Sequence, residues 1–152
     1  MILSPHTIQF LGLLKPCLHS GTLMGVSHGL GHAGYDLRVA EDHIILPGAF
    51  CLASAIEEFN MPDTVAGIIY NKSTWARRGL AVFNTVVEPG WCGSLTIELA
   101  NHGGQRLEIT KGMGIAQVIF YFLDRPTDNP YTGKYQGQKP GPQAAIFETG
   151  DG

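Results

Sequence analysis

The sequence predicts an all-β domain, a barrel or a sandwich, rather than an α/β sheet. Many short segments of strand composition follow one another along the chain, and Gly and Pro residues separate them. Their alternation of apolar and polar residues is typical of strands with one buried face. The length of 152 residues suits one domain with one hydrophobic core.

The expected elements follow from local patterns. Ser4 and Pro5 form an N-cap and a first-turn proline, which predicts a short helix to about Leu14. The segment 21–34 is rich in Gly, Ser and His and is expected to be a loop. One helical turn or a tight loop is expected within 71–78. Strands are expected at 35–39, 44–46, 50–56, 65–70, 80–87, 95–99, 107–109 and 115–123.

The composition changes at about Asp124, where Pro, Gly, Gln and Tyr become frequent. Such a segment makes a poor core. We therefore expect a β-domain over residues 1–123 and a mobile C-terminal tail over residues 124–152.

The bulk composition excludes several classes of protein. Apolar residues make up 44% of the chain and charged residues 15%, which is typical of a globular domain and not of a disordered one. The net charge is -3 without a long run of Lys or Arg, which argues against binding of nucleic acid but not of a single nucleotide. No apolar stretch is long enough for a membrane span and no secretory signal is apparent, so a cytoplasmic protein is expected.

Cysteine and histidine are not spaced as metal ligands. The three cysteines are far apart and odd in number, which predicts reduced thiols rather than disulfides. Six histidines are present, and His28 and His32 stand four apart, but among glycines rather than on a clear helical face. We therefore expect neither a zinc site nor any other protein metal centre.

The first candidate for chemistry is Glu98. In the segment 94–100, the period of two places Leu95, Ile97 and Leu99 on the apolar face, and Thr96 and Glu98 together on the other face. A glutamate beside small polar residues suits a cleft that holds water or a polar ligand. A solvent-facing glutamate on an ordinary amphipathic strand remains the alternative.

Two further segments carry polar groups suited to a nucleotide. In 71–80, hydroxyls and cations surround a capped turn, which fits a phosphate cradle or a capped helix with a solvated basic face. In 131–138, Lys, Tyr and Gln provide charge, stacking and amide groups, as a lid over a nucleotide needs, although a solubilising tail has a similar composition. Asp36 lies on the polar face of a strand, where a structural role is favoured over a metal site.

The order of five motifs is more specific than any one of them. The sequence contains Gly-Tyr-Asp-Leu at 34–37, Lys-Ser-Thr-Trp-Ala-Arg at 72–77, Glu-Pro-Gly-Trp at 88–91 followed by Thr-Ile-Glu at 96–98, Gly-Ile-Ala-Gln at 114–117, and Gly-Lys-Tyr-Gln-Gly-Gln at 133–138. Together they resemble the dCTP deaminases of the dUTPase-like superfamily. The match covers about residues 31–138.

The resemblance implies a distorted β-barrel or jelly roll that assembles as a homotrimer, with active sites between subunits and dCTP bound with Mg²⁺ as the substrate. It implies that Glu98 is the catalytic glutamate and that Arg77 lies beside it, with Ser73 as a further catalytic group. The residues expected to bind the nucleotide are Lys72, Ser73, Thr74, Trp75, Ala76, Arg77, Thr85, Glu88, Thr96, Ile97, Glu98, Gln117, Tyr131, Lys134 and Gln138.

We hypothesise that Glu98 removes a proton from water and returns protons as the 4-amino group leaves, because the chain lacks the ligands with which zinc deaminases activate water. Ser73 and Thr85 would orient that water, and Arg77 would keep Glu98 ionised or stabilise developing negative charge.

Alternatives remain on the same scaffold. A dUTP diphosphatase would cleave at the α-phosphate, but dUTPases usually carry an aliphatic residue at the position of Glu98 and a glycine-rich C-terminal phosphate motif. Some deaminases also hydrolyse the dUTP that they form, and the sequence leaves this second activity open. A non-catalytic nucleotide-binding module is a further alternative.

The sequence departs from the family pattern before Glu88, where the segment is two residues shorter than in well-known bacterial deaminases. Val86 falls near the residue that shapes the pocket at the pyrimidine 4-position. Both features leave the base preference open.

Overall fold

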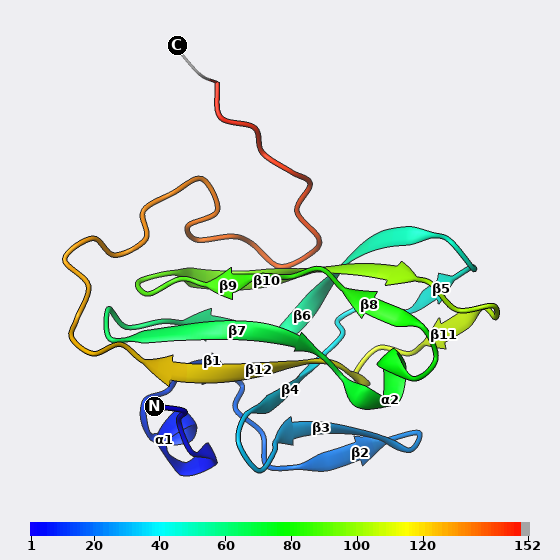
Figure 1. Cartoon of the computed structure of the whole chain (residues 1–152), viewed down its shortest axis with the longest axis horizontal. Coiled ribbons are helices and arrows are strands. Elements are labelled where there is room, and N and C mark those ends of the chain that lie inside the picture. The colour runs from blue at the N-terminus through cyan, green and yellow to red at the C-terminus, as the bar shows by residue number, and fades with distance from the viewer. Residues whose placement is uncertain (150–152) are drawn as a thin grey trace.

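The computed structural model describes residues 1–149, and antiparallel strands make up most of its regular structure. Strands β7, β9, β10 and β12 run along the long axis of the molecule, and the C-terminal segment arches over β9 and β10 (Figure 1). Two short helices complete the fold. The prediction of an all-β domain with one or two short helices is confirmed.

The first sheet contains four strands in the order β1-β6-β10-β8. Their bounds are Leu14–Lys15 for β1, Phe50–Asn60 for β6, Cys92–Asn101 for β10 and Leu80–Val82 for β8. The long strands β6 and β10 pair antiparallel along most of their length, with a register shift between Ser94 and Thr96. This irregularity lies next to the segment that carries Glu98.

The second sheet contains six strands in the order β2-β3-β4-β12-β7-β9. Their bounds are Gly21–Leu23, Val26–Leu30, Tyr35–Arg38, Gly114–Phe122, Val65–Asn71 and Val86–Val87 in that order. A separate ribbon pairs β5, His43–Ile45, with β11, Leu107–Ile109.

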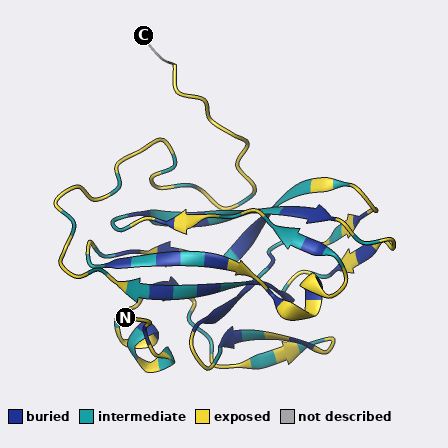
Figure 2. Ribbon diagram, in the orientation of Figure 1, coloured by how far each residue is buried: buried dark blue, intermediate teal, exposed yellow. Residues whose placement is uncertain are grey.

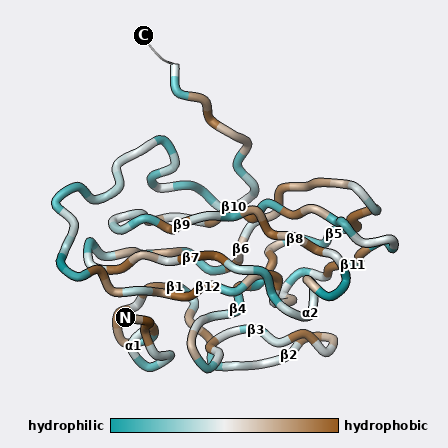
Figure 3. Tube along the Cα trace, viewed as in Figure 1, coloured by the Kyte–Doolittle hydropathy of each residue, from teal (hydrophilic) through white to brown (hydrophobic). Residues whose placement is uncertain are grey.

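One apolar core joins the two sheets. Ile97 and Leu99 of β10 and Val118 and Phe120 of β12 are fully buried. The ring of Phe120 packs against that of Phe59 on β6, with 6.3 Å between the ring centroids. Buried residues alternate with accessible ones along several strands, and hydrophobic segments concentrate in the strands rather than in the tail (Figures 2 and 3). The alternation of apolar and polar residues in the sequence therefore predicted most of the residues on the buried faces of the strands.

A buried carboxylate also connects the sheets. Glu57 of β6 is fully buried and accepts hydrogen bonds from the Tyr35 hydroxyl at 3.0 Å and from the Arg38 backbone and Nε at 2.9 and 2.7 Å. Both partners lie on β4 in the other sheet. Burial and the nearby carboxylate raise the pKa of Tyr35, so its hydroxyl remains a donor. No local pattern in the sequence indicated this network.

Several expected elements differ from the structure. Helix α1, Pro5–Phe10, ends before Leu14, because Gly12 takes a φ of +63° and Leu14 pairs with β6 instead. The segment expected to be a loop contains the β2–β3 hairpin, whose turn at Met24 and Gly25 has positive φ at both residues, the geometry that two-residue hairpins favour.

The expected strand 80–87 is two strands, β8 and β9, in different sheets. The expected strand 50–56 continues to Asn60 as β6. Helix α2, Ser73–Ala76, confirms the expected single turn. Among the described residues, no helix is long and apolar enough to cross a membrane.

Residues 124–149 contain no regular strand or helix, but part of this tail is tied to the domain. Gln138 forms a bridge with Gly93, and the Ser94 N–H donates to the Gln138 carbonyl at 2.9 Å. The Trp91 indole donates to the Tyr135 carbonyl at 2.7 Å. The tail therefore docks on the start of β10, the strand that bears Glu98.

Candidate active site

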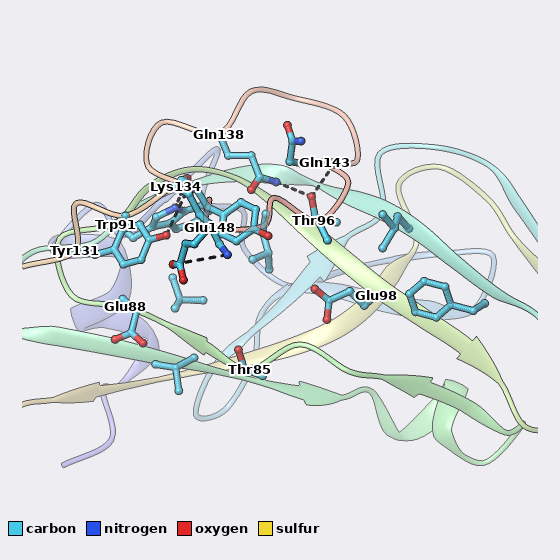
Figure 4. A pocket seen from close by; sticks show the side chains of 18 residues that line it. Thr85, Glu88, Trp91, Thr96, Glu98, Tyr131, Lys134, Gln138, Gln143 and Glu148 are labelled. Carbon is cyan, nitrogen blue, oxygen red and sulfur yellow. Dashed lines mark hydrogen bonds and ion pairs between the residues drawn. The ribbon is translucent and has the colours of Figure 1, made fainter. Parts of the chain in front are cut away.

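A cavity of about 700 Å³ lies between β10, the connection from β8 to β9, and the C-terminal tail (Figure 4). Seven of the expected site residues line it: Thr85, Glu88, Thr96, Glu98, Tyr131, Lys134 and Gln138. They come from three parts of the chain that the fold brings together. Carboxylates, hydroxyls, amides and one ammonium group face a partly apolar pocket, which suits a small polar ligand with an aromatic ring.

Glu98 enters this pocket from the middle of β10. Its neighbours Ile97 and Leu99 are fully buried in the core, so the alternation of the strand directs Glu98 the other way. Burial raises the pKa of the Glu98 carboxyl above its usual value near 4.5. A carboxylate with a raised pKa in a cleft is a candidate general base. Thr85 lies across the cavity from it (Figure 4).

The tail closes over Thr96. The Thr96 hydroxyl accepts hydrogen bonds from Gln138 Nε2 at 2.5 Å and from the Gln143 backbone N–H at 2.9 Å. Leu95 was expected on the core face with Ile97, and it does pack against the core, but it is only half-buried and also lines the pocket beside Thr96, where the register of β10 shifts. Strand alternation alone could not show this bulge.

Lys134 brings a cation to the pocket from the tail. Its Nζ atom lies 3.8 Å from Glu148 Oε1 and 5.4 Å from the centre of the Tyr135 ring. The side chain is about one third exposed, so both interactions compete with solvent. An anionic ligand can therefore replace Glu148 as the partner of Lys134.

The block 72–77 lies away from this pocket within the same chain, on and around α2 (Figure 1). Ser73, Thr74, Ala76 and Arg77 are exposed, and Arg77 Nε donates to the Ser73 hydroxyl at 3.3 Å. None of them lines the cavity that holds Glu98. The expected proximity of Arg77 to Glu98 is thus not present within one chain.

The remaining residues that were expected to bind the nucleotide lie outside the cavity and make contacts within the chain. Lys72 is buried and paired with Asp36, which is the structural role expected for that aspartate. Trp75 is also buried, and its indole donates to the Gly114 carbonyl at 2.8 Å. Ile97 lies in the core, and Gln117 pairs on β12 with Asp36 and Tyr70, outside the cavity.

The pocket wall also contains residues that were not among those expected to bind the nucleotide, although Trp91 and Tyr135 stand in two of the five motifs. Apolar side chains extend the pocket between its polar groups, and two further polar residues come from the end of the tail: Phe50, Leu52, Val87, Trp91, Leu95, Tyr135, Gln143 and Glu148. Val86, expected near the pyrimidine 4-position, also lines it. Only the fold brings Phe50 and Leu52 near Glu98, through the pairing of β6 with β10.

Residues 1–149 contain no group of three or more His, Cys, Asp or Glu side chains placed to hold a metal ion. The three cysteines are free and half-buried, as expected. Glu88 and Glu148 are the carboxylates that share the pocket with Glu98. These oxygen donors fit a magnesium ion that is already coordinated by phosphate oxygens, rather than a site formed by protein ligands alone.

Solved structures with the same architecture include dUTPases. A point mutant of the dUTPase of Staphylococcus phage 80alpha superimposes with a TM-score of 0.60 at 18% identity, over 80% of this chain and 97% of that one. The dUTPase of EIAV gives a TM-score of 0.56 at 22% identity, over 66% of this chain and 84% of that one. A point mutant of the dUTPase from phage phi11 of S. aureus, described with a structural Mg(II) ion, gives 0.55 at 16% identity over 66% and 83% of the two chains. At these identities, the comparison establishes the fold.

Comparison of the sequence with known proteins identifies the family within this fold. The family model for dCTP deaminase-like proteins matches residues 35–123. A dCTP deaminase of Campylobacter curvus is 36% identical over 146 residues, 75% of this chain and 78% of that protein. A dUMP-forming dCTP deaminase of Persephonella marina is 32% identical over 147 residues, 96% of this chain and 76% of that protein. The chain belongs to the dCTP deaminase-like family.

Proposed function

We propose that this chain hydrolyses the 4-amino group of dCTP to give dUTP and ammonia, with Glu98 as the general base and acid. The single observation that carries the proposal is the position of Glu98, half-buried and with a raised pKa, in the pocket that also collects the tail motif. Membership of the dCTP deaminase-like family supports dCTP as the substrate. The position of Glu98 in the pocket supports Glu98 as the catalytic residue.

The chemistry requires two proton transfers through one carboxylate. Glu98 takes a proton from water as the oxygen attacks C4, and delivers it to N3 of the ring. It then takes the proton of the new hydroxyl group and delivers it to the amine as the C4–N bond breaks. Water and dCTP thus become dUTP and ammonia, and Glu98 returns to its ionised form. Thr85, which lines the facing wall, would orient the water.

The separation of Arg77 from Glu98 within one chain supports sites formed between subunits of a homotrimer. In this arrangement, Ser73 and Arg77 of one subunit complete the pocket that holds Glu98 of another. The exposure of both residues leaves them free to do so. Phe50 and Val86 line the pocket and are 58% and 47% exposed, and Phe83, in the connection from β8 to β9, is 52% exposed. These exposed apolar side chains are consistent with a surface that another subunit covers.

The substrate carries its own divalent cation in this proposal. Mg²⁺ bound to the triphosphate would meet the carboxylates of Glu88 and Glu148, which are ligands of the kind it prefers. When bound, the ion would neutralise phosphate charge, and Lys134 contributes a protein cation to the same pocket.

Product analysis tests the function directly. The purified protein is incubated with dCTP and Mg²⁺, and the nucleotides are resolved by ion-pair chromatography. We expect dUTP and ammonia in equal amounts. If dCTP stays intact while dUTP is cleaved to dUMP and pyrophosphate, the protein is a diphosphatase and the proposal is overturned. Nucleotide binding without any product would instead show a non-catalytic relative.

A second activity has specific support. The solved structures of this fold described above are dUTPases, and the relative from Persephonella marina is named as dUMP-forming. Hydrolysis of the newly formed dUTP on the same scaffold would give dUMP and pyrophosphate from dCTP. The same chromatogram distinguishes this outcome, because dUMP then accumulates with dCTP as the only nucleotide supplied.

A further inference from the structure

The chain changes sheets beside Glu98. Strand β8 pairs with β10 up to Val82 opposite Leu99, whereas β9 pairs with β7 in the other sheet. Only residues 83–85 separate the two strands. The Phe83 N–H still donates to the Glu98 carbonyl at 3.0 Å, and the Thr85 carbonyl already accepts from Ile69 at 3.2 Å.

Because the chain leaves the sheet at this crossover, β10 has no neighbouring strand on this side along the segment from Thr96 to the Glu98 N–H. The Thr96 carbonyl and the Glu98 N–H point toward the departing strand, where a ladder would have continued. The side chain of Asn84 bonds both groups. Its Nδ2 donates to the Thr96 carbonyl at 2.7 Å, and its Oδ1 accepts from the Glu98 N–H at 3.0 Å. A carboxamide has one donor and one acceptor side, so it substitutes for a peptide group of the missing strand.

The two clamped residues are the ones whose side chains enter the pocket. Thr96 and Glu98 line the cavity, while Ile97 between them is fully buried in the core. The Asn84 amide therefore holds the backbone on both sides of Ile97. Because Cα and Cβ follow the backbone, this clamp sets the direction in which the Glu98 carboxylate enters the cavity.

We propose that Asn84 is a positioning residue for deamination, which acts by fixing the backbone of Thr96 and Glu98 against the edge left by the β8–β9 crossover. The inference rests on the proposed role of Glu98. Misplacement of a reacting group by about 1 Å lowers rates by up to about 100-fold. Substrate binding depends on many other groups of the pocket and tail, so the effect falls on kcat rather than on KM.

The test compares Asn84→Ala with Asn101→Ala. Asn101 lies at the end of β10 and, like Asn84, bonds backbone groups through its side chain, those of Ile45, Gln105 and Gly103, but it does not line the cavity. We expect Asn84→Ala to lower kcat for dCTP by about 10- to 100-fold with KM changed by less than about 3-fold. Asn101→Ala should lower the melting temperature and leave kcat per folded protein near that of the wild type.

A double-variant cycle identifies the residue through which Asn84 acts. In the Glu98→Gln background, Asn84→Ala should slow turnover by less than about 2-fold, because the group that it positions has already been disabled. Equal slowing in both backgrounds would show a general structural defect and overturn the proposal. An unchanged kcat for Asn84→Ala, or a loss confined to KM, would also overturn it.

Three further outcomes are distinguishable. If Asn84→Ala does not fold, Asn84→Asp has the same shape and keeps the acceptor for the Glu98 N–H while losing the donor to the Thr96 carbonyl, and it should show the same kcat-selective loss. If Glu98→Gln retains full activity, the proposed role of Glu98 fails, and the Asn84 proposal fails with it. If Glu98→Gln is inactive while Asn84→Ala and Asn84→Asp are fully active, only the Asn84 proposal is overturned.

Discussion

The ammonium group of Lys72 lies 2.5 Å from the carboxylate of Asp36, and only 8% and 12% of the two side chains are exposed. Lys72 also donates to the Ser27 hydroxyl at 2.7 Å, and that hydroxyl bonds the same carboxylate at 3.1 Å. The cation that the sequence assigned to phosphate binding is therefore already paired within its own chain. Its neighbours Ser73 and Arg77 remain available to a nucleotide or to another subunit.

Removal of Asp36 should destabilise the protein. In Asp36→Ala, Lys72 would remain in a buried position without a carboxylate, and breaking a buried pair in this way costs about 3–5 kcal/mol of unfolding free energy. Urea denaturation at fixed protein concentration measures the loss. Glu108→Ala is the matched control, because its pair with Arg106 is 63% and 60% exposed and should contribute less than about 1 kcal/mol. Equal effects of both substitutions would contradict a stabilising role for the buried pair.

Replacement of Glu98 by Gln should nearly abolish turnover without preventing binding. The amide has almost the same shape but cannot accept a proton from water, so kcat should fall by about 100- to 10,000-fold. Calorimetry should still detect dCTP binding with an affinity close to that of the wild type. Loss of binding together with activity would assign Glu98 a structural role instead.

The pH dependence of activity should reflect the environment of Glu98. A general base acts only when ionised, so kcat/KM declines as pH falls through its pKa. Because burial raises the pKa of Glu98 above 4.5, this decline should begin at a higher pH than for an exposed glutamate. A profile that stays flat down to pH values near 4.5 would contradict the assignment.

The same raised pKa predicts the sign of a stability effect. The folded state holds the proton of Glu98 more strongly than the unfolded chain does, so this group favours folding at low pH. That contribution is lost as pH rises from the unfolded pKa through the raised folded pKa. Glu98→Gln should therefore melt at a higher temperature than the wild type at neutral pH, and the difference should vanish in acid. A lower melting temperature at neutral pH would contradict this.

Gly93→Ala should release the tail from β10. Gly93 has a φ of +146°, and a Cβ there would lie 2.7 Å from the Gln138 backbone nitrogen and 2.9 Å from its oxygen. We expect faster cleavage by trypsin at Lys134 and a higher KM for dCTP, because Gln138 loses its place over Thr96. Gly104→Ala, where a Cβ meets no atom within 4 Å, is the control. Unchanged cleavage in Gly93→Ala would show that the bridge is not what holds the tail.

Sites shared between subunits can be tested by complementation. Glu98→Gln and Arg77→Ala should each be inactive alone, but their co-expression with two different affinity tags should restore activity. In a cyclic trimer assembled at random, about a quarter of the sites would combine an intact Glu98 with an intact Arg77 from the neighbouring subunit. Mixed particles that carry both tags but remain inactive would show that both residues serve the same chain's site. Light scattering of the same samples gives the number of subunits.

The sequence predicted the β-domain and the core face of its strands well, since strand alternation and Gly or Pro turns are local signals. It was less successful where pairing overrides local preference. Leu14 has the composition of a helix end, yet it pairs with Phe59. The glycine-rich segment around Met24 looks like a loop, yet its positive φ angles form a hairpin turn. In both cases the free energy of sheet formation outweighs a weak local preference.

Side-chain identity and spacing are properties of the chain, so the sequence alone established which residues carry chemical groups and which family the order of motifs resembles. How these groups are distributed in space depends on the tertiary structure. It placed Glu98 with Thr85 and the tail in one pocket, and Lys72 with Asp36 in another part of the molecule. It also showed that the Asn84 side chain completes the edge of β10. These relationships depend on strand pairings between residues far apart in sequence, and no local pattern specifies the partner of a strand or the point at which a chain leaves its sheet.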